Sequence, residues 1–161
     1  MSETEIIESI EFRSLTEDDI PFVVELEEKN FSIPWSAQSF TNIIKDDFSC
    51  SIVGILEGEV VAYSVFGVIE DYSELWNFAV TERYRRIGVG GRLLNQVIDL
   101  CRTSGVSTIF LQVRESNLAA QNLYKKNGFT YVMVQKNYYH TPVEDALVFR
   151  LDIIPPAPKR K

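Results

Sequence analysis

The chain has 161 residues, of which 45% are hydrophobic, and this length and composition suit one globular domain with a single core. Its formal net charge of −7 argues against a general nucleic-acid binder, because such proteins present a basic surface to the phosphate backbone. An acidic surface would attract a basic protein partner at long range, although many soluble proteins are acidic without having such a partner.

The sequence shows no signal for a membrane, for secretion or for a metal. No apolar run reaches the ~18 residues that a membrane-spanning helix needs. Residues 1–5 are acidic rather than apolar, unlike a secretory leader. Cys50 and Cys101 lack metal-ligand spacing, and we interpret both as reduced thiols in or near the core. We therefore expect a cytoplasmic protein without a metal site.

Strands and helices alternate along the chain, and their order predicts an α/β fold with a mixed sheet. The expected strands span residues 10–15, 50–56, 60–68, 72–80, 107–113, 131–135 and 146–151. The expected helices cover residues 16–29, a short stretch after 36, the segment from the loop after residue 80 to 104, and residues 117–127. Residues 1–154 would form the single domain, and a Pro-rich basic tail, 155–161, would be mobile.

The loop after the expected strand 72–80 carries three glycines and three arginines, in Tyr84-Arg85-Arg86-Ile87-Gly88-Val89-Gly90-Gly91-Arg92. A helix N-terminus offers free backbone N–H groups and partial positive charge, and glycines let a bulky anion approach them. A dinucleotide fingerprint would need a glycine at Leu93, and a P-loop would need Gly-Lys-Ser or Gly-Lys-Thr, which the chain lacks. The remaining Arg-x-x-Gly-x-Gly pattern indicates a phosphate or pyrophosphate site, or else a tight turn with solvated arginines.

From Glu74 to Arg150 the sequence resembles the GNAT superfamily of acyl-CoA-dependent N-acetyltransferases, whose pyrophosphate signature is Arg-x-x-Gly-x-Gly. Other segments follow in family order: Phe31-Ser32-Ile33-Pro34-Trp35-Ser36, Asn77-Phe78-Ala79-Val80, Val113-Arg114-Glu115-Ser116-Asn117, Leu123-Tyr124, Asn127-Gly128-Phe129, Asn137-Tyr138-Tyr139 and Glu144-Asp145-Ala146. Pro-Trp-Ser and Asn-Tyr-Tyr are similar to the RimI-type ribosomal-protein alanine N-acetyltransferases. The resemblance implies a GNAT fold, with a mixed, mostly antiparallel central sheet and flanking helices. That sheet would splay at the cofactor site, between the strands that end at Val80 and Val113.

The same resemblance implies that acetyl-CoA is the co-substrate. The implied contact residues are Phe78, Ala79, Val80, Arg85, Arg86, Ile87, Gly88, Val89, Gly90, Gly91, Asn117 and Tyr124. The loop would hold the pyrophosphate, and the strand backbone would bind the pantetheine arm and polarise the thioester carbonyl. Asn117 would bond the same arm, cap its helix, or do both. Tyr124 would give a proton to the departing thiolate, although a tyrosine there can equally be a core aromatic.

The general base that the resemblance implies is missing. Twelve residues before Tyr124 the RimI-type pattern has a glutamate, and here that position is Gln112, whose amide cannot take a proton. Gln112 would at most hold a water that relays the proton to solvent or to Glu74, which can also be a plain surface carboxylate. His140, the only histidine, is expected in a loop after Tyr139 as a surface residue.

The missing base matters less for some substrates than for others. An α-amine with a pKa of about 7.7–8.0 is roughly a tenth neutral at pH 7, whereas a lysine with a pKa of about 10.4 is far less so. The resemblance implies a peptide slot walled by Trp35 on one side and by Tyr138 and Tyr139 on the other, since rigid aromatics hold an extended chain at low entropy cost. These aromatics can instead be hinge packing.

We therefore expect transfer to the N-terminal α-amine of a protein, namely the alanine of a small-subunit ribosomal protein. The enzyme would be a monomer or weak dimer that binds neither nucleic acid nor membrane. Two alternatives remain open. One is an acetyltransferase for a small amine or lysine, and the other is a non-catalytic domain that binds acyl-CoA or peptide and has lost turnover through Gln112.

Overall fold

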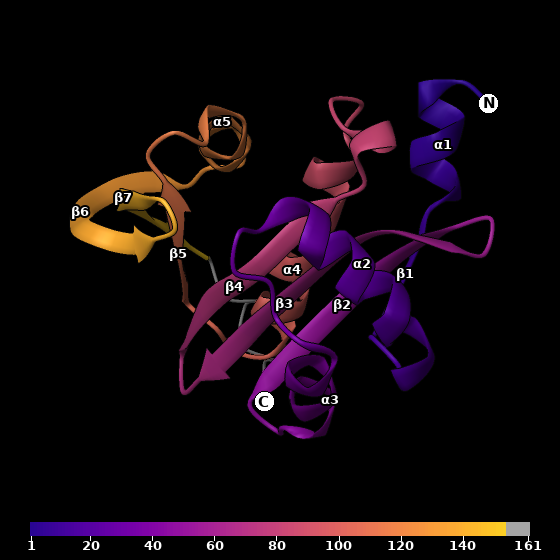
Figure 1. Cartoon of the computed structure of the whole chain (residues 1–161), viewed down its shortest axis with the longest axis horizontal. Coiled ribbons are helices and arrows are strands. Elements are labelled where there is room, and N and C mark those ends of the chain that lie inside the picture. The colour runs from indigo at the N-terminus through magenta and orange to yellow at the C-terminus, as the bar shows by residue number, and fades with distance from the viewer. Residues whose placement is uncertain (154–161) are drawn as a thin grey trace, which may run out of the picture.

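The computed structural model describes residues 1–153, which form a seven-stranded sheet with helices on both faces (Figure 1). The strands are β1 (Glu11–Arg13), β2 (Ser49–Leu56), β3 (Glu59–Ile69), β4 (Tyr72–Val80), β5 (Thr108–Arg114), β6 (Thr130–His140) and β7 (Val143–Asp152). The helices are α1 (Glu3–Ser9), α2 (Ile20–Asn30), α3 (Ala37–Lys45), α4 (Val89–Thr103) and α5 (Leu118–Lys126), with 3-10 turns η1 (Glu17–Asp19) and η2 (Glu82–Tyr84). The predicted tail, 155–161, lies outside the described residues.

The strand order is β1-β2-β3-β4-β5-β7-β6, and every neighbouring pair is antiparallel except β4 and β5. This confirms the predicted α/β GNAT-type sheet, mixed but mostly antiparallel. No helix within residues 1–153 is both long and apolar enough to cross a lipid bilayer.

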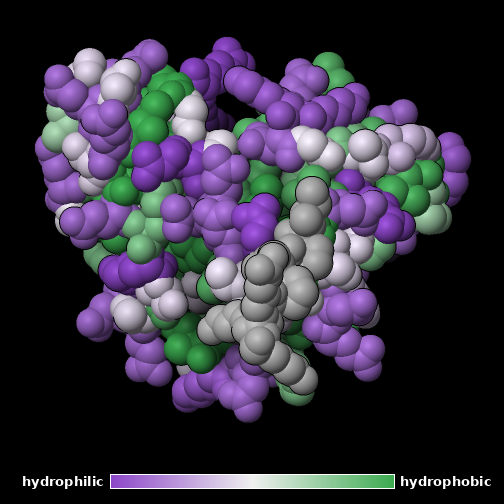
Figure 2. All heavy atoms as spheres, turned by 180° about the vertical axis from the view of Figure 1, so that it is seen from behind, coloured by the Kyte–Doolittle hydropathy of each residue, from purple (hydrophilic) through white to green (hydrophobic). Residues whose placement is uncertain are grey.

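Each face of the sheet carries its own apolar layer. On one face α4 buries Leu93 and Val97 completely, in a cluster that continues over the sheet and down to α5. On the other face α2 and α3 bury Val23 and Phe40 against Tyr63 of β3. The outer surface seen from the α4 side is largely hydrophilic, with apolar side chains in small separate groups (Figure 2). The helices therefore bury their apolar faces against the sheet.

Helix boundaries follow the local signals in the sequence. The Ser36 hydroxyl accepts a hydrogen bond from the Ser39 N–H (3.1 Å) and starts α3, and Asn117 Oδ1 accepts one from the Ala120 N–H (3.1 Å) and starts α5. Gly128 has a φ of 94°, so the chain leaves α5 in a conformation that favours glycine. The predicted cap role of Asn117 is therefore confirmed.

The sheet opens between its two parallel strands. β4 and β5 are paired only from Tyr72 with Thr108 to Leu75 with Leu111, although β4 runs on to Val80 and β5 to Arg114. Beyond Leu75, β4 is bonded to β3 on its other edge, so its backbone groups on the β5 side have no partner strand. The predicted splay between these two strands is confirmed.

Two elements, β6 and α1, differ most from the sequence prediction, whereas β1, α2 and β7 differ only at their ends. β6 continues through Asn137-Tyr138-Tyr139 to His140, so the loop predicted around His140 is wrong. A register break between Gln135 and Tyr139 interrupts the alternation that marks a strand, and Asn137 there has a φ of 51° and donates its N–H to Asp145 (2.8 Å). The helix α1 was not predicted at all, and it packs Ile6 and Ile7 on the α4-side cluster.

Candidate active site

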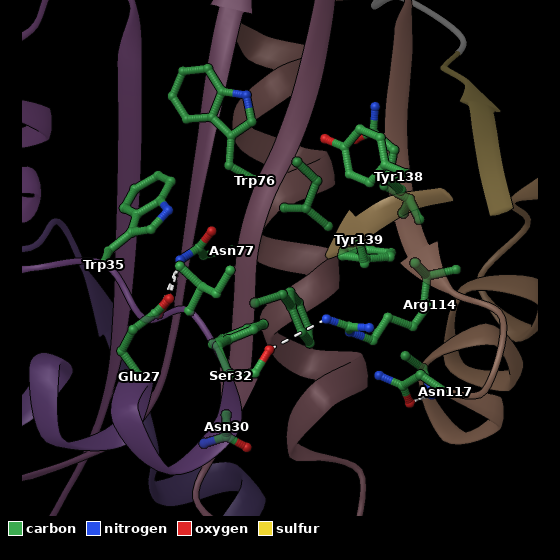
Figure 3. Close-up of a pocket in the computed structure, with 18 of the residues that line it drawn as sticks. Glu27, Asn30, Ser32, Trp35, Trp76, Asn77, Arg114, Asn117, Tyr138 and Tyr139 are labelled. Carbon is green, nitrogen blue, oxygen red and sulfur yellow. Dashed lines mark hydrogen bonds between the residues drawn. The ribbon is translucent and has the colours of Figure 1, made fainter. Parts of the chain in front are cut away.

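A cavity of about 370 Å³ opens where β4 and β5 separate (Figure 3). Its walls come from the end of α2 with the loop after it, from β4, β5 and α5, and from the end of β6. The predicted site residues that line it are Trp35, Phe78, Gln112, Asn117, Tyr124, Tyr138 and Tyr139. His140 is exposed, as expected, but also borders the cavity. Glu74, Ala79, Val80 and the loop 85–91 lie outside this lining.

Tyr124 stands at the inner end of the cavity on α5. Its ring packs edge-on against Phe78 of β4 (6.1 Å between centroids) and Phe129 (5.7 Å). Burial raises the pKa of Tyr124, and the nearby Tyr139 raises it further, so the hydroxyl stays protonated at neutral pH. None of the residues that the structure describes exchanges a hydrogen bond with this hydroxyl, which leaves it free for a ligand in the cavity.

Gln112 and Glu74 lie on neighbouring strands and on the same face of the sheet. Glu74 is paired with Phe110, and Gln112 is two residues further along β5, so both side chains project toward the α2 side. The Glu74 carboxylate is turned to Trp76, whose Nε1 donates to it (3.3 Å). Gln112 thus reaches the cavity, whereas Glu74 lies outside its lining.

Two tryptophans build one wall of the cavity. Trp76 is the extra residue of a bulge in β4, between Leu75 and Asn77, and its ring lies 6.4 Å from that of Trp35. Gly67 of β3 makes room for it, because a Cβ at that position would stand 2.4 Å from the Trp76 ring. Sequence reasoning missed Trp76, and a tryptophan in a strand gave no signal of the bulge that turns it into the site.

Arg114 ties the opposite wall together and was also missed. It lies over the Tyr139 ring (4.2 Å to the centroid) and forms an ion pair with Glu144 (3.1 Å). It also donates to the Ser32 hydroxyl (3.3 Å) and to the carbonyls of Thr141 (3.2 Å) and Pro142 (3.1 Å). The side chain therefore joins β5 to the β6–β7 turn and to the α2–α3 loop. Its only sequence signal was its place in the Val-Arg-Glu motif.

Tyr138 and Tyr139 complete this wall near the end of β6. Their rings meet edge-on, 5.0 Å apart. Burial raises the pKa of Tyr139 to about 12, with Tyr138 as a further cause, while the positive Arg114 acts in the opposite direction. The structure therefore brings Trp35, Tyr138 and Tyr139 to one cavity.

The glycine loop lies between β4 and α4 beyond the cavity. Gly88 has a φ of 106° and Arg86 a φ of 64°, so the chain turns sharply just before the first helical residue, Val89. A Cβ at Gly90 would stand 3.2 Å from Leu123 of α5, which places the two helices close together at this point. The first N–H groups of α4 have no partners within the helix and suit an anion.

Two arginines of this loop, Arg85 and Arg92, contact other parts of the protein. Arg85 donates from Nε to the Val80 carbonyl (3.0 Å) and from Nη2 to Asn30 Oδ1, so it closes the end of β4 onto α2. Arg92 lies over the Phe12 ring at 5.8 Å. The backbone N–H groups, more than the Arg85 side chain, are thus available to a phosphate.

Comparison with known proteins shows which family has this sequence and fold. The model of the acetyltransferase (GNAT) family matches residues 20–129. The chain is 34% identical to the [ribosomal protein bS18]-alanine N-acetyltransferase of Escherichia coli K12 over 142 residues, 87% of this chain and 95% of that protein. It is 31% identical to a putative enzyme of the same name from Bacillus subtilis, over 88% of this chain and 94% of that protein.

A solved structure agrees with these sequence matches. The crystal structure of the ribosomal-protein-S18-alanine N-acetyltransferase from Escherichia coli superposes with a TM-score of 0.83 at 31% identity, covering 94% of this chain and 98% of that one. The family model, the two relatives and this structure all point to the same family. The chain belongs to the GNAT family of acetyltransferases.

Proposed function

We propose that this chain transfers the acetyl group of acetyl-CoA to the N-terminal α-amine of a protein, with the N-terminal alanine of a small-subunit ribosomal protein as substrate. The observation that carries the proposal is one cavity that reaches both the gap between β4 and β5 and a slot lined by Trp35, Tyr138 and Tyr139. The names of the Escherichia coli and Bacillus subtilis relatives support the same substrate class. Residues 1–154 would act as one cytoplasmic domain, as a monomer or weak dimer.

The residues on the β4 side fit an extended acyl-CoA. β4 has no partner strand on its β5 side from Phe78 to Val80, and apart from the Val80 carbonyl, which accepts from Arg85, its backbone groups on that side suit the amides of a pantetheine arm. Asn117 borders the cavity and would bond the same arm while it caps α5. The first N–H groups of α4, from Val89 to Gly91, and the turn at Gly88 would receive the pyrophosphate.

Tyr124 would act as the general acid. When the amine attacks the thioester carbon, a C–N bond forms, the C–S bond breaks and the sulfur takes the electron pair. A buried tyrosine whose hydroxyl has no hydrogen-bond partner among residues 1–153 can give its proton to that sulfur and regain one from solvent. The raised pKa of Tyr124 keeps its hydroxyl protonated at neutral pH, although it also makes this hydroxyl a weaker acid than a free tyrosine.

The amine must lose its proton without a carboxylate at position 112. An α-amine with a pKa of about 7.7–8.0 is roughly a tenth neutral at pH 7, so a fraction of the substrate arrives ready to attack. Gln112 can orient this amine or a water beside it, and Glu74 on the next strand would receive the proton through that water. A lysine, with a pKa of about 10.4, would be a far poorer substrate.

The decisive experiment measures CoA release from acetyl-CoA between pH 6 and 9 with two peptides. One begins with alanine and contains no lysine, and the other has a blocked N-terminus and one lysine. We expect turnover of the first peptide only, rising with pH toward the pKa of the α-amine. Turnover of the blocked peptide at a similar rate would reject transfer to the N-terminus.

Gln112 also favours a second candidate, a domain that binds acetyl-CoA and peptide without turnover. Tight acetyl-CoA binding without CoA release in the presence of either peptide, together with activity gained in Gln112→Glu, would select this candidate over the enzyme.

A further inference from the structure

Glu27 of α2 is an ionisable side chain in a place where sequence reasoning gave it no role. It is completely buried, with 0% of its surface exposed, yet it borders the active-site cavity beneath Trp35 (Figure 3). An unpaired charge in such a place would be strongly destabilising, so its partners must justify it.

Two side-chain donors from neighbouring strands converge on this carboxylate, and Glu27 itself lies in the last turn of α2, where its backbone carbonyl accepts from the Phe31 N–H at the start of the loop that carries Trp35 (3.0 Å). The Tyr63 hydroxyl of β3 donates to Oε2, and Asn77 Nδ2 of β4 lies 2.5 Å from Oε1 and 3.0 Å from Oε2. The backbone N–H of Trp35, in the α2–α3 loop, also favours the ionised form. The backbone of Asn77 is fixed further, because its main-chain carbonyl accepts a hydrogen bond from the Ser64 hydroxyl (2.9 Å).

This pattern argues against a role as general base. Both oxygens of Glu27 already accept hydrogen bonds, and the residue is sealed from solvent. Burial raises the pKa of Glu27 by more than Tyr63, Asn77 and Trp35 lower it, so these donors offset only part of the cost of burying the carboxylate. A base needs a free lone pair directed at the substrate, and this carboxylate directs its lone pairs at the protein.

The partners nevertheless belong to the two sides of the reaction. Trp35 forms a wall of the proposed peptide slot, and Asn77 immediately precedes Phe78, where β4 offers its backbone to the acetyl donor. We propose that Glu27 is a positioning residue for the acceptor peptide, because it holds the Trp35 loop at a fixed distance from the donor strand. This inference rests on the proposed transfer to a peptide.

The test compares two conservative variants of the same buried network. In Glu27→Gln one oxygen becomes an N–H donor that faces Asn77 or Trp35, so the link between them is broken. In Tyr63→Phe the carboxylate loses a donor of similar strength but keeps Asn77 and Trp35. Both variants should lower the melting temperature by similar amounts, which makes Tyr63→Phe the control for a merely structural effect.

We expect Glu27→Gln to raise the KM for the alanine peptide about tenfold, the effect of one lost hydrogen bond to a charged group, while kcat and acetyl-CoA affinity change little. Tyr63→Phe should leave that KM within about twofold. An equal rise in both variants would overturn the proposal, and so would a large loss of kcat in Glu27→Gln at unchanged KM. If Glu27→Gln does not fold, Asn77→Ser breaks the same link from the strand side and should give the same rise.

A spectroscopic measurement tests the positioning without any substrate. The chain has two tryptophans, Trp35 and Trp76, so the variant Trp76→Phe reports on Trp35 alone. Adding Glu27→Gln to it should shift the Trp35 emission to longer wavelength and increase quenching by acrylamide, whereas adding Tyr63→Phe should do neither. An unchanged Trp35 signal would refute the inference even if the peptide proves to be the wrong substrate. A changed signal without peptide turnover would support the link between Glu27 and the Trp35 loop but would reject the proposed function, and with it the role toward the acceptor peptide.

Discussion

The variant Tyr124→Phe isolates the proposed proton transfer, because it removes one oxygen atom and nothing else. The ring would keep its edge-on contacts with Phe78 and Phe129, and the lost hydroxyl has no hydrogen-bond partner among residues 1–153. Replacing an unpartnered buried hydroxyl by hydrogen is close to neutral, so the free energy of unfolding should change by less than about 0.5 kcal/mol.

The effect on rate should be much larger. General acid catalysis is worth about 10²- to 10⁴-fold, and a thiolate with an intrinsic pKa of about 8.5 is already a fair leaving group, which places the loss near the lower end. We expect kcat to fall about 10²-fold, equivalent to about 2.7 kcal/mol of barrier, with acetyl-CoA affinity nearly unchanged.

Single-turnover acetylation of the alanine peptide measures this loss, with acetyl-CoA binding by calorimetry and thermal unfolding as companions. Tyr131→Phe is the control, because Tyr131 lies on β6 in edge-on contact with Phe149 and outside the cavity. Retention of the rate within about threefold in Tyr124→Phe would refute the reasoning, since the thiolate would then leave without this proton.

Three further variants address the remaining parts of the site. Gln112→Glu should raise kcat/KM for the alanine peptide about tenfold at pH 6.5 and little at pH 9. The added carboxylate can take the proton of the α-amine, and this helps only at a pH where most of the amine is protonated. An equal gain at both pH values would contradict this. Arg114→Ala should raise the peptide KM about 30-fold, or about 2 kcal/mol, through loss of the Tyr139 and Glu144 contacts, and peptide titration measures it. Gly88→Glu should abolish acetyl-CoA binding in calorimetry, whereas Gly58→Glu, which has the same charge and a positive φ of 83° in the β2–β3 turn, should not; equal binding in both would remove the loop from the site.

Local patterns in the sequence were enough to predict the parts of the fold that depend on neighbouring residues. β4 was predicted with its observed bounds, and the caps at Ser36 and Asn117 act over three residues. β6 was cut short because a bulge between Gln135 and Tyr139 breaks the alternation on which strand prediction depends. The register of such a bulge is set by its partner strand, β7, and not by its own residues.

The candidate site divides along the same line. Gln112, Asn117 and Tyr124 lie within recognisable sequence motifs, and the structure brings all three to one cavity. Glu27 gave no signal, because acidic residues on a helix are normally solvated and its partners Tyr63 and Asn77 lie 36 and 50 residues away. The position of Trp76 in the cavity wall depends on a bulge in β4 and on Gly67 in the neighbouring strand β3, and the periodicity of the sequence reveals neither.

Two links hold the acceptor side of the cavity onto the splayed sheet. On one wall the buried Glu27 of α2 is bonded to Asn77 of β4 and is proposed to hold the Trp35 loop, and on the other Arg114 connects the α2–α3 loop and the β6–β7 turn to β5. The proposed peptide slot would thus be fixed separately to each of the two strands, β4 and β5, that separate at the proposed acetyl-CoA site. Catalysis by proximity needs only that these walls keep the amine and thioester at reacting distance. A site held in this way can accept Gln112, because an α-amine brings its own neutral fraction and the protein mainly has to position it.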